Sequence, residues 1–565
     1  MLLANHRIEL DARPTATVPT VLEVVLLGHC PSPVGQGDVA QLFASGVPAK
    51  VSDGVKLIGN IRWDNLARDR QLLAEIGSLG FAPQTARLQE LVQALDSGTG
   101  AGEQKILLQP QDRLLMELYN LPIPLYSFGH FQALFPDAFD TATHYRSVLA
   151  GDRAWLPLAV QDFFANSSGD HPLKLWILRV DESAGSQAFL PTSGANMIEP
   201  ETLGAFERAL LIPRVGILAL PDLERLQIPA HLEDIPRMRL DNPVPAFLPC
   251  GTDLEDGQRE RRHGNEIAAM PEPLAPRDII LPIARALAQF RPDMQCLLTA
   301  PLAAVAGSER PSLSPEFIDL LSDAAGLDAD GALTDDAPKP LTQAMRHLQI
   351  LFPYLRGSDR KLSSPTGLIA GMQAAVSQQQ GPWRSIGERP LPGRCLPWPP
   401  LTQQHATALR TRPGITTLLH RAGNLIVDDE RICTPCLSGN GLAQLSKERR
   451  NEEQWRSAEI MRFIGWLRRE LQTLGERMIF NVDPRDPRSA LALRAFFTRL
   501  HGLGALRGRR AEDGFTLTQR NDSEGLIAFD IEIAPAYPID RIRISFLQDR
   551  HSASASTTIE VSHAG

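Results

Sequence analysis

The sequence has few cysteines for its length. Six are spread over 565 residues, too sparse for the disulfide framework that stabilises small secreted domains, so we expect synthesis in a reducing cytosol. Cys433 and Cys436 have the CxxC spacing, which can supply half of a tetrahedral zinc site or form a redox pair. A zinc site needs two more ligands, and no second CxxC or paired histidine follows. We therefore favour two ordinary buried thiols over a metal site.

The common signatures of enzymes are missing as well. The sequence has no GxxxxGK[ST] phosphate loop, HExxH zinc helix, GxSxG nucleophile elbow or GxGxxG fingerprint. Histidines at positions 171, 347 and 420 have no cysteine or carboxylate at ligand spacing. We predict a protein that is not an enzyme and has no cofactor. The rival interpretation is a cytosolic thiol- or zinc-dependent enzyme that uses Cys433 and Cys436.

Long hydrophobic runs and an excess of positive charge are also lacking. The most apolar run, 209–220, is interrupted by Pro213 and Arg214, and we expect neither a membrane span nor a signal peptide. The net charge of -9 argues against a general nucleic-acid binder. With 43% hydrophobic and 22% charged residues, the composition is that of a globular protein, and 565 residues require two to four domains.

The C-terminal part contains elements that build interfaces. Apolar residues recur every three or four positions over 460–474 and again over 493–503, which predicts two amphipathic helices. Residues 527–533 and 542–546 alternate apolar with charged side chains, which predicts two half-buried strands. If these strands pair, the acids of one can lie near the arginines of the other and help to fix their register.

A group of arginines closes the second predicted helix. Cations at this position oppose the negative end of a helix dipole, so the group is either a solvated helix terminus or a docking surface for an acidic partner. The candidate contact residues are Arg499, Arg507, Arg509 and Arg510.

Short alternating patterns lie near both ends of the chain. Residues 7–11 alternate near the start, and residues 557–561 alternate after a stretch rich in serine and alanine. Such segments are either disordered termini or arms that add strands to the sheets of neighbouring copies. The candidate arm residues are Arg7, Ile8, Glu9, Leu10, Thr558, Ile559 and Val561.

A series of sequence blocks resembles the contractile tail sheath proteins of phage tails, tailocins and extracellular injection machines. The segment 163–180 is similar to the family pattern FF.NGG...yvvRV, and 381–384 is similar to the start of rGvwkaPaN. Two departures stand out: Met461 replaces one of two adjacent arginines, and 481–483 replaces Glu-Pro-Asn. In chain order the matching blocks are 127–135, 163–180, 351–356, 364–371, 381–384, 455–464, 480–484 and 496–508.

The resemblance implies an α+β multidomain fold. It comprises an inner α/β sheath domain built from both chain ends, an outer α/β middle domain and an inserted domain. We expect an N-terminal arm (1–20), a middle domain (21–32 plus 122–399), an inserted domain (33–121), a C-terminal inner domain (400–548) and a C-terminal arm (549–565).

The resemblance also implies a function and partners. The subunit would polymerise with itself as a helical stack of hexameric rings around a tail tube protein, and contract to drive that tube through a target envelope. Baseplate and terminator or cap proteins would bind the ends, with no nucleic acid and no membrane insertion. Assembly would occur in the bacterial cytoplasm, and the product would be a virion tail or an injection particle. The alternative is a low-copy baseplate or terminal adaptor of similar fold.

Overall fold

The structure is a computed structural model that describes most of the chain outside the N-terminal region. Residues 1–20 and most of 32–118 lie outside the described part, and so do the expected N-terminal arm residues Arg7, Ile8, Glu9 and Leu10, and Cys436. The described residues are 21–31, 49–50, 105–106, 119–135, 138–140, 149–168, 173–192, 199, 202–228, 273–303, 311–325, 339–359, 361–393, 395–411, 414–433, 456–479, 487–520, 526–536, 541–549 and 554–562.

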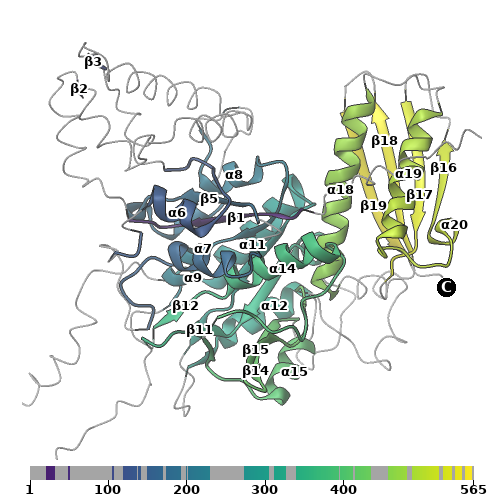
Figure 1. The fold of residues 1–565 in the computed structure, drawn as a ribbon. Coiled ribbons are helices and arrows are strands. Elements are labelled where there is room, and N and C mark those ends of the chain that lie inside the picture. Colours follow the sequence, from purple (N-terminus) through teal and green to yellow (C-terminus); the bar gives the residue numbers. More distant parts are fainter. Residues whose placement is uncertain are drawn as a thin grey trace, which may run out of the picture.

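An eight-stranded sheet organises the larger part of the molecule (Figure 1). Its six central strands run parallel, and the two edge strands, β15 and β4, are antiparallel to their neighbours. The order across the sheet is β15 (Asn424–Val427), β14 (Thr416–Arg421), β10 (Leu348–Phe352), β7 (Gln295–Thr299), β6 (Val215–Ala219), β1 (Glu23–Gly28), β5 (Leu175–Arg179) and β4 (Ile123–Leu125).

Helices cover both faces of this sheet, because its central strands are buried on both sides. Val24 and Leu26 of β1 pack into the cluster under one helical layer, whereas Val25 and Leu27 pack into the cluster under the other. The first layer contains α6 (Phe128–Leu134), α7 (Leu156–Phe164) and α14 (Thr366–Gln380). The second contains α8 (Ala205–Leu210), α9 (Pro221–Leu226), α11 (Pro276–Phe290), α12 (Pro315–Ala325) and α13 (Lys339–Met345).

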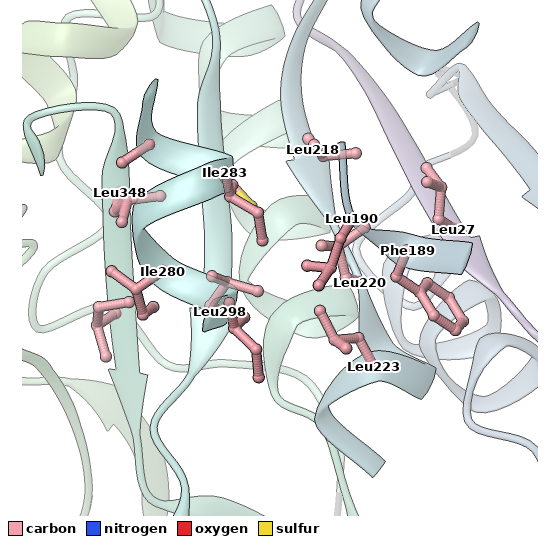
Figure 2. Packing of buried hydrophobic residues seen from close by; sticks show 14 of the residues in the cluster. Leu27, Phe189, Leu190, Leu218, Leu220, Leu223, Ile280, Ile283, Leu298 and Leu348 are labelled. Carbon is pink, nitrogen blue, oxygen red and sulfur yellow. The ribbon is translucent and has the colours of Figure 1, made fainter. Parts of the chain in front are cut away.

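The second layer seals the sheet with aliphatic side chains. Figure 2 shows Ile280 and Ile283 of α11 beside Leu298 of β7, in the same cluster as Leu348 of β10. The chain before residue 458 also contains smaller elements. The short helices are η1 (Glu182–Ala184), η2 (Ser186–Phe189) and α15 (Gln403–Thr411). The short strands form the pairs β2 (Ala49–Lys50) with β3 (Lys105–Ile106) and β8 (Leu302–Ala303) with β9 (Ser312–Leu313), and the sheet β12 (Leu362–Ser363), β11 (Tyr354–Arg356), β13 (Leu396–Trp398).

The C-terminal unit has its own sheet and helices (Figure 1). The two predicted helices are confirmed as α18 (Ala458–Ile479) and α19 (Arg488–Gly502), and the two predicted strands as β17 (Leu526–Ile533) and β18 (Arg541–Asp549). β17 and β18 pair antiparallel with Glu532 opposite Arg543, as the sequence predicted. The remaining elements are α20 (Ala511–Gly514), β16 (Phe515–Arg520) and β19 (Ser554–Ser562), in the order β16-β17-β18-β19.

The boundary of the large sheet differs from the expected position after residue 399. β14 and β15 pair with this sheet, so it extends to Val427, and the separate C-terminal unit begins with α18. The boundary is set by pairing between strands that are distant in sequence, so the local sequence pattern does not predict it. Among the described residues, no helix combines the length and apolar character needed to cross a bilayer.

Candidate functional site

Two of the sequence blocks meet where α7 crosses α14. Gly367 and Gly371 lie one turn apart on α14 and face the backbone of α7. A Cβ atom at Gly367 would lie 2.3 Å from the carbonyl oxygen of Ala159, and one at Gly371 would lie 2.4 Å from that of Phe163. Only glycine permits this approach of two helix backbones. The 163–180 and 364–371 blocks are therefore parts of one contact.

Asn166 fastens the same crossing. Its Nδ2 donates hydrogen bonds to the carbonyl oxygens of Asp162 (3.1 Å), at the end of its own helix, and of Leu368 (3.2 Å) on α14. The amide thus satisfies a carbonyl at the C-terminal end of α7, where helix carbonyls lack intrahelical donors. Asn166 fixes the place at which the two helices cross.

Arg179, at the end of β5, is fully buried although it carries a charge. Its Nη2 donates to the carbonyl oxygen of Cys30 at 2.7 Å, and its guanidinium lies 4.7 Å from the ring centroid of Tyr119 and 5.3 Å from that of Phe135. Aromatic faces stabilise a guanidinium that is removed from water. The arginine of the 163–180 block therefore holds the end of β1 against the outer strands.

The carboxyl ends of β1 and β6 are the place where doubly wound sheets bind ligands, because the strand order reverses there. Here the carboxylate of Asp222 fills that place. It accepts hydrogen bonds from the backbone N–H groups of His29 (2.8 Å), Trp155 (2.8 Å) and Leu156 (2.9 Å). The last two are orphan donors at the start of α7, where a negative group is favourable.

The Asp222 carboxylate is closely packed as well as hydrogen-bonded. Burial raises its pKa to about 6, and Arg225 and the three N–H donors oppose that rise. A Cβ atom at Gly28 would lie 2.5 Å from Asp222 Oδ2, so glycine is required at the end of β1. At this edge of the sheet the chain's own side chain takes the position of a bound anion.

A second pair of blocks meets where α18 docks on the large domain; we call this contact the joint and define it by Glu430, Arg462, Asp293 and Arg469. The Glu430 carboxylate, 0% exposed, accepts hydrogen bonds from Arg462 Nη1 (2.7 Å) and Nη2 (3.2 Å). Arg462 Nη2 also donates to the carbonyl oxygen of Arg384 at 2.9 Å. The 381–384 and 455–464 blocks are thereby connected.

Three further donors complete the surroundings of Glu430. They are Gln373 Nε2 (2.7 Å), Ser385 Oγ (3.0 Å) and the backbone N–H of Ile386 (2.7 Å). Burial tends to raise the pKa of Glu430, but Arg462 and these donors outweigh burial and hold the pKa below its ordinary value. The carboxylate is therefore ionised and fully satisfied.

The other half of the joint lies at the end of α11. Asp293 Oδ2 accepts from Arg469 at 3.0 Å and from Arg291 at 2.8 Å, and these arginines lower its pKa to about 2 against the effect of burial. A Cβ atom at Gly465 would lie 2.2 Å from the Asp293 carbonyl oxygen. The helix α18 is thus held by charge and by backbone contact on the same face.

A series of aromatic rings continues from the joint into the C-terminal unit. The rings pack in succession with centroid distances between 5.2 and 6.2 Å, and they span the large domain, α18, α19 and β16. Aromatic pairs of this kind contribute about 0.5–1.5 kcal/mol beyond the area they bury. We call this series the aromatic ladder; its members are Trp383, Trp466, Phe496, Phe497 and Phe515, with Phe463 packed beside the first two.

The four candidate arginines of the basic group lie at the surface. Arg499, Arg507, Arg509 and Arg510 are all exposed. Arg507 also donates from Nε to the carbonyl oxygen of Pro535 (2.5 Å), which ties the loop after α19 to the segment after β17. They lie in the last turn of α19 and in the loop that follows it. Their role as a contact surface stays a prediction.

The C-terminal candidate residues Thr558, Ile559 and Val561 lie in β19. This strand pairs antiparallel with β18 of the same chain, from Arg541 opposite Ser562 to Asp549 opposite Ser554. Four residues separate the two strands. An exchange of β19 with a neighbouring copy would therefore require this hairpin to open.

Cys433 has the surroundings of a structural thiol. It is buried, and burial raises its pKa to about 12, so the thiol keeps its proton at neutral pH. The thiolate is the form that binds metal or attacks a substrate. Within the described ranges, histidine, cysteine and carboxylate side chains form no group of three or more able to hold a metal ion.

The sequence did not identify the acidic residues that organise these contacts. Asp222 lies 193 residues from His29 and 67 from Trp155, and Glu430 lies 32 residues from Arg462. Neither acid forms a motif with its neighbours. Both acids lie in short charged stretches, 222–225 and 428–431, which resemble solvated turns in sequence, so no local signal marks them as buried.

Comparison with protein-family models finds no match, and no curated protein matches the sequence. Comparison with solved structures finds chains that are similar to this one. One is a chain of the anti-feeding prophage baseplate, with 14% identity over 77% of this chain and 87% of that chain and a TM-score of 0.43. Another comes from the PVC sheath complex of an extracellular contractile injection system in the contracted state (12%, 74% and 84%, 0.41). A sheath tail protein from Listeria innocua is also similar (9%, 78% and 91%, 0.40).

Proposed function

We propose that the chain is the structural subunit of a contractile tail sheath, which polymerises around a tail tube and contracts to drive the tube through a target envelope. The observation that carries this proposal is the meeting of the sequence blocks in space. The 163–180 and 364–371 blocks form the crossing of α7 and α14, and the 381–384 and 455–464 blocks form the joint. Blocks that resemble one family in sequence thus act together in the fold.

The proposed mechanism uses the domains as rigid bodies. A subunit whose domains are tied by a buried ion pair and by close backbone contact can rotate as a unit while flexible links to its neighbours persist. In the proposed sheath, the terminal arms provide those links by pairing with strands of neighbouring copies. Contraction then releases a metastable extended lattice, and this subunit hydrolyses no nucleotide.

The proposed partners follow from the same arrangement. Copies stack as hexameric rings, and the C-terminal unit faces the tube protein with Arg499, Arg507, Arg509 and Arg510 as the contact patch. An acidic tube surface would complement these exposed cations. Baseplate and cap proteins bind the two ends of the stack, which assembles in the bacterial cytoplasm as part of a virion tail or injection particle.

Electron microscopy of the overexpressed full chain tests the proposal. We expect striated hollow tubes or rings, because a sheath subunit carries its own polymerisation contacts. A stable monomer at high concentration, with or without the tube protein, contradicts a sheath role. The copy number in purified particles separates a sheath from a terminal adaptor, because the sheath subunit is present in many rings and the adaptor in few copies.

A further inference from the structure

Another carboxylate, that of Glu459, lies beside the ion pair of Glu430 and Arg462 in the joint. Glu459 lies on the first turn of α18, three residues before Arg462, whose guanidinium already binds Glu430. The Glu459 residue keeps partial exposure, but its Oε2 atom is buried and accepts no hydrogen bond from any described group. The carboxylate receives a hydrogen bond from its own backbone N–H, but an ionised form would lack the five donors that surround Glu430.

The charged groups facing Glu459 come from two elements. Asp429 and Glu430 belong to the segment after β15, and Arg462 belongs to α18 itself. Asp429 is paired with Arg431 at 2.9 Å, and Gln373 of α14 brings only a neutral amide to Glu430. Among the described residues, an ionised Glu459 is therefore repelled by two carboxylates, Glu430 and Asp429, and attracted by one arginine, Arg462.

The excess of negative charge and the burial of Glu459 change the pKa of its carboxyl. Burial, followed by the repulsion from Glu430, raises the pKa of Glu459 to about 7, and the attraction of Arg462 opposes the rise. When α18 leaves the large domain, water reaches the carboxylate and the pKa returns towards the ordinary value of a glutamate, about 4.3. The docked state therefore binds a proton that the undocked state releases.

We propose that the joint is a proton-sensitive switch: a proton on Glu459 stabilises the docking of the first turns of α18 on the large domain, and loss of that proton loosens it. Glu459 lies beside residues that contact the large domain, so loosening of the first turns of α18 would disturb those contacts. The backbone N–H of Ala458 donates to the carbonyl oxygen of Glu430 at 3.4 Å, and Phe463 packs edge to face on Trp383 of the aromatic ladder. The proposal concerns the single chain and is independent of the proposed assembly.

The direction of the pH effect follows from proton linkage. A carboxyl whose pKa is raised in the docked state stabilises docking below its ordinary pKa, and the effect is lost as the pH rises through about 7. The opening constant should therefore climb by up to about tenfold per pH unit between about pH 5 and 7, and level off above that range.

Hydrogen exchange of the full-length chain measures this opening. Amides of residues 458–466 are followed from pH 5 to 8.5 and corrected for the intrinsic rate at each pH. We expect the protection of these amides to fall by up to about tenfold per pH unit between about pH 5 and 7. In Glu459→Gln, which cannot ionise, we expect protection to be independent of pH. Glu476→Gln serves as the matched control, because Glu476 is exposed on the same helix and should leave the wild-type profile unchanged.

Two results would overturn the proposal. One is a wild-type profile that stays flat across this pH range after correction. The other is a Glu459→Gln protein that keeps the wild-type dependence, which would assign the titration to another group. If Glu459→Gln does not fold, Glu459→Ala provides the same readout, because it also removes the titrating carboxyl and should again give a flat profile.

Discussion

The side chain of Glu430 is 0% exposed, so its charge depends on the five hydrogen bonds that protein donors give it. Breaking one partner of such a buried pair costs about 3–5 kcal/mol, since the remaining charge loses its compensation. An exposed pair contributes about 0–1 kcal/mol, because water and salt screen it. An arginine–carboxylate ion pair therefore contributes more to the free energy of unfolding at the joint than at the surface.

We predict that Arg462→Met lowers the free energy of unfolding by about 3–5 kcal/mol at pH 7. The loss should shrink as the pH falls, because Glu430 can then take up a proton and become neutral. Calorimetry of the full chain at pH 5 and 7 measures both effects. Arg520→Met is the control, since Arg520 and Asp530 form a pair at 2.9 Å that is 48% and 42% exposed. Equal losses in the two variants would contradict the assignment.

A second prediction concerns the glycines of α14. Gly367→Ala should destabilise the protein by about 1–3 kcal/mol, because the new methyl group would overlap the backbone of α7. Gly502→Ala, at the end of α19, meets nothing within 4 Å and should be neutral or stabilising by up to about 1 kcal/mol. Urea denaturation of both variants provides the comparison. A neutral Gly367→Ala would show that the helices can separate without loss.

At the scale of elements, α18 belongs to both parts of the molecule. One stretch of it contacts the large domain through Arg462, Gly465 and Arg469, and its apolar side chains pack with α19 and the C-terminal sheet. The aromatic ladder runs through Trp466 on the same helix. Among the described residues, the ion pairs and close backbone contacts named above couple the two parts through this helix.

We predict that Trp466→Ala separates the unfolding of the two parts. The cost should be about 3–5 kcal/mol, as for other large buried aromatic residues, and a single calorimetric transition should become two. Leu491→Ala on α19 is the control, because Leu491 is 57% exposed and its truncation should change stability by no more than about 0.5 kcal/mol. A single transition in Trp466→Ala would mean that the polar contacts alone couple the parts.

The sequence predicted the elements whose signal is local. Helix α18 shows its apolar period within a few turns, and β17 and β18 show alternation within eight or nine residues. The place of β14 and β15 in the large sheet was missed, because it depends on pairing with β10 more than sixty residues earlier. The partners of Asp222 and Glu430 were missed for the same reason: folding creates these contacts, and no local pattern records them.

At the scale of the whole molecule, the two ends of the chain are where copies would connect. β19 is an edge strand of the C-terminal sheet, and its pairing with β18 follows a hairpin of four linking residues. A strand paired this way can pair identically with β18 of another copy once the hairpin opens. The described side chains of the C-terminal core come from α18, α19, β16, β17 and β18, and α18 also packs against β19.

We predict that deletion of residues 1–12, or of 552–565, abolishes polymer formation and leaves a folded monomer. Electron microscopy reports the polymer, and circular dichroism with size-exclusion chromatography reports the fold. Deletion of 563–565, which leaves β19 complete, is the matched control and should still polymerise. Normal polymers from either long deletion would refute the arm hypothesis.

The length of α18 has a mechanical consequence. Its 22 residues correspond to a rod of about 33 Å, and its ion pairs with the large domain extend from Arg462 to just past its middle, at Arg469. The far end of the helix, Ile479, lies about 15 Å beyond the last of these contacts, so a rotation of about 10° there would move it by about 3 Å. Small angular changes at the joint therefore reach the far end of α18 as displacements of a few ångströms, on the order of 3 Å for 10°.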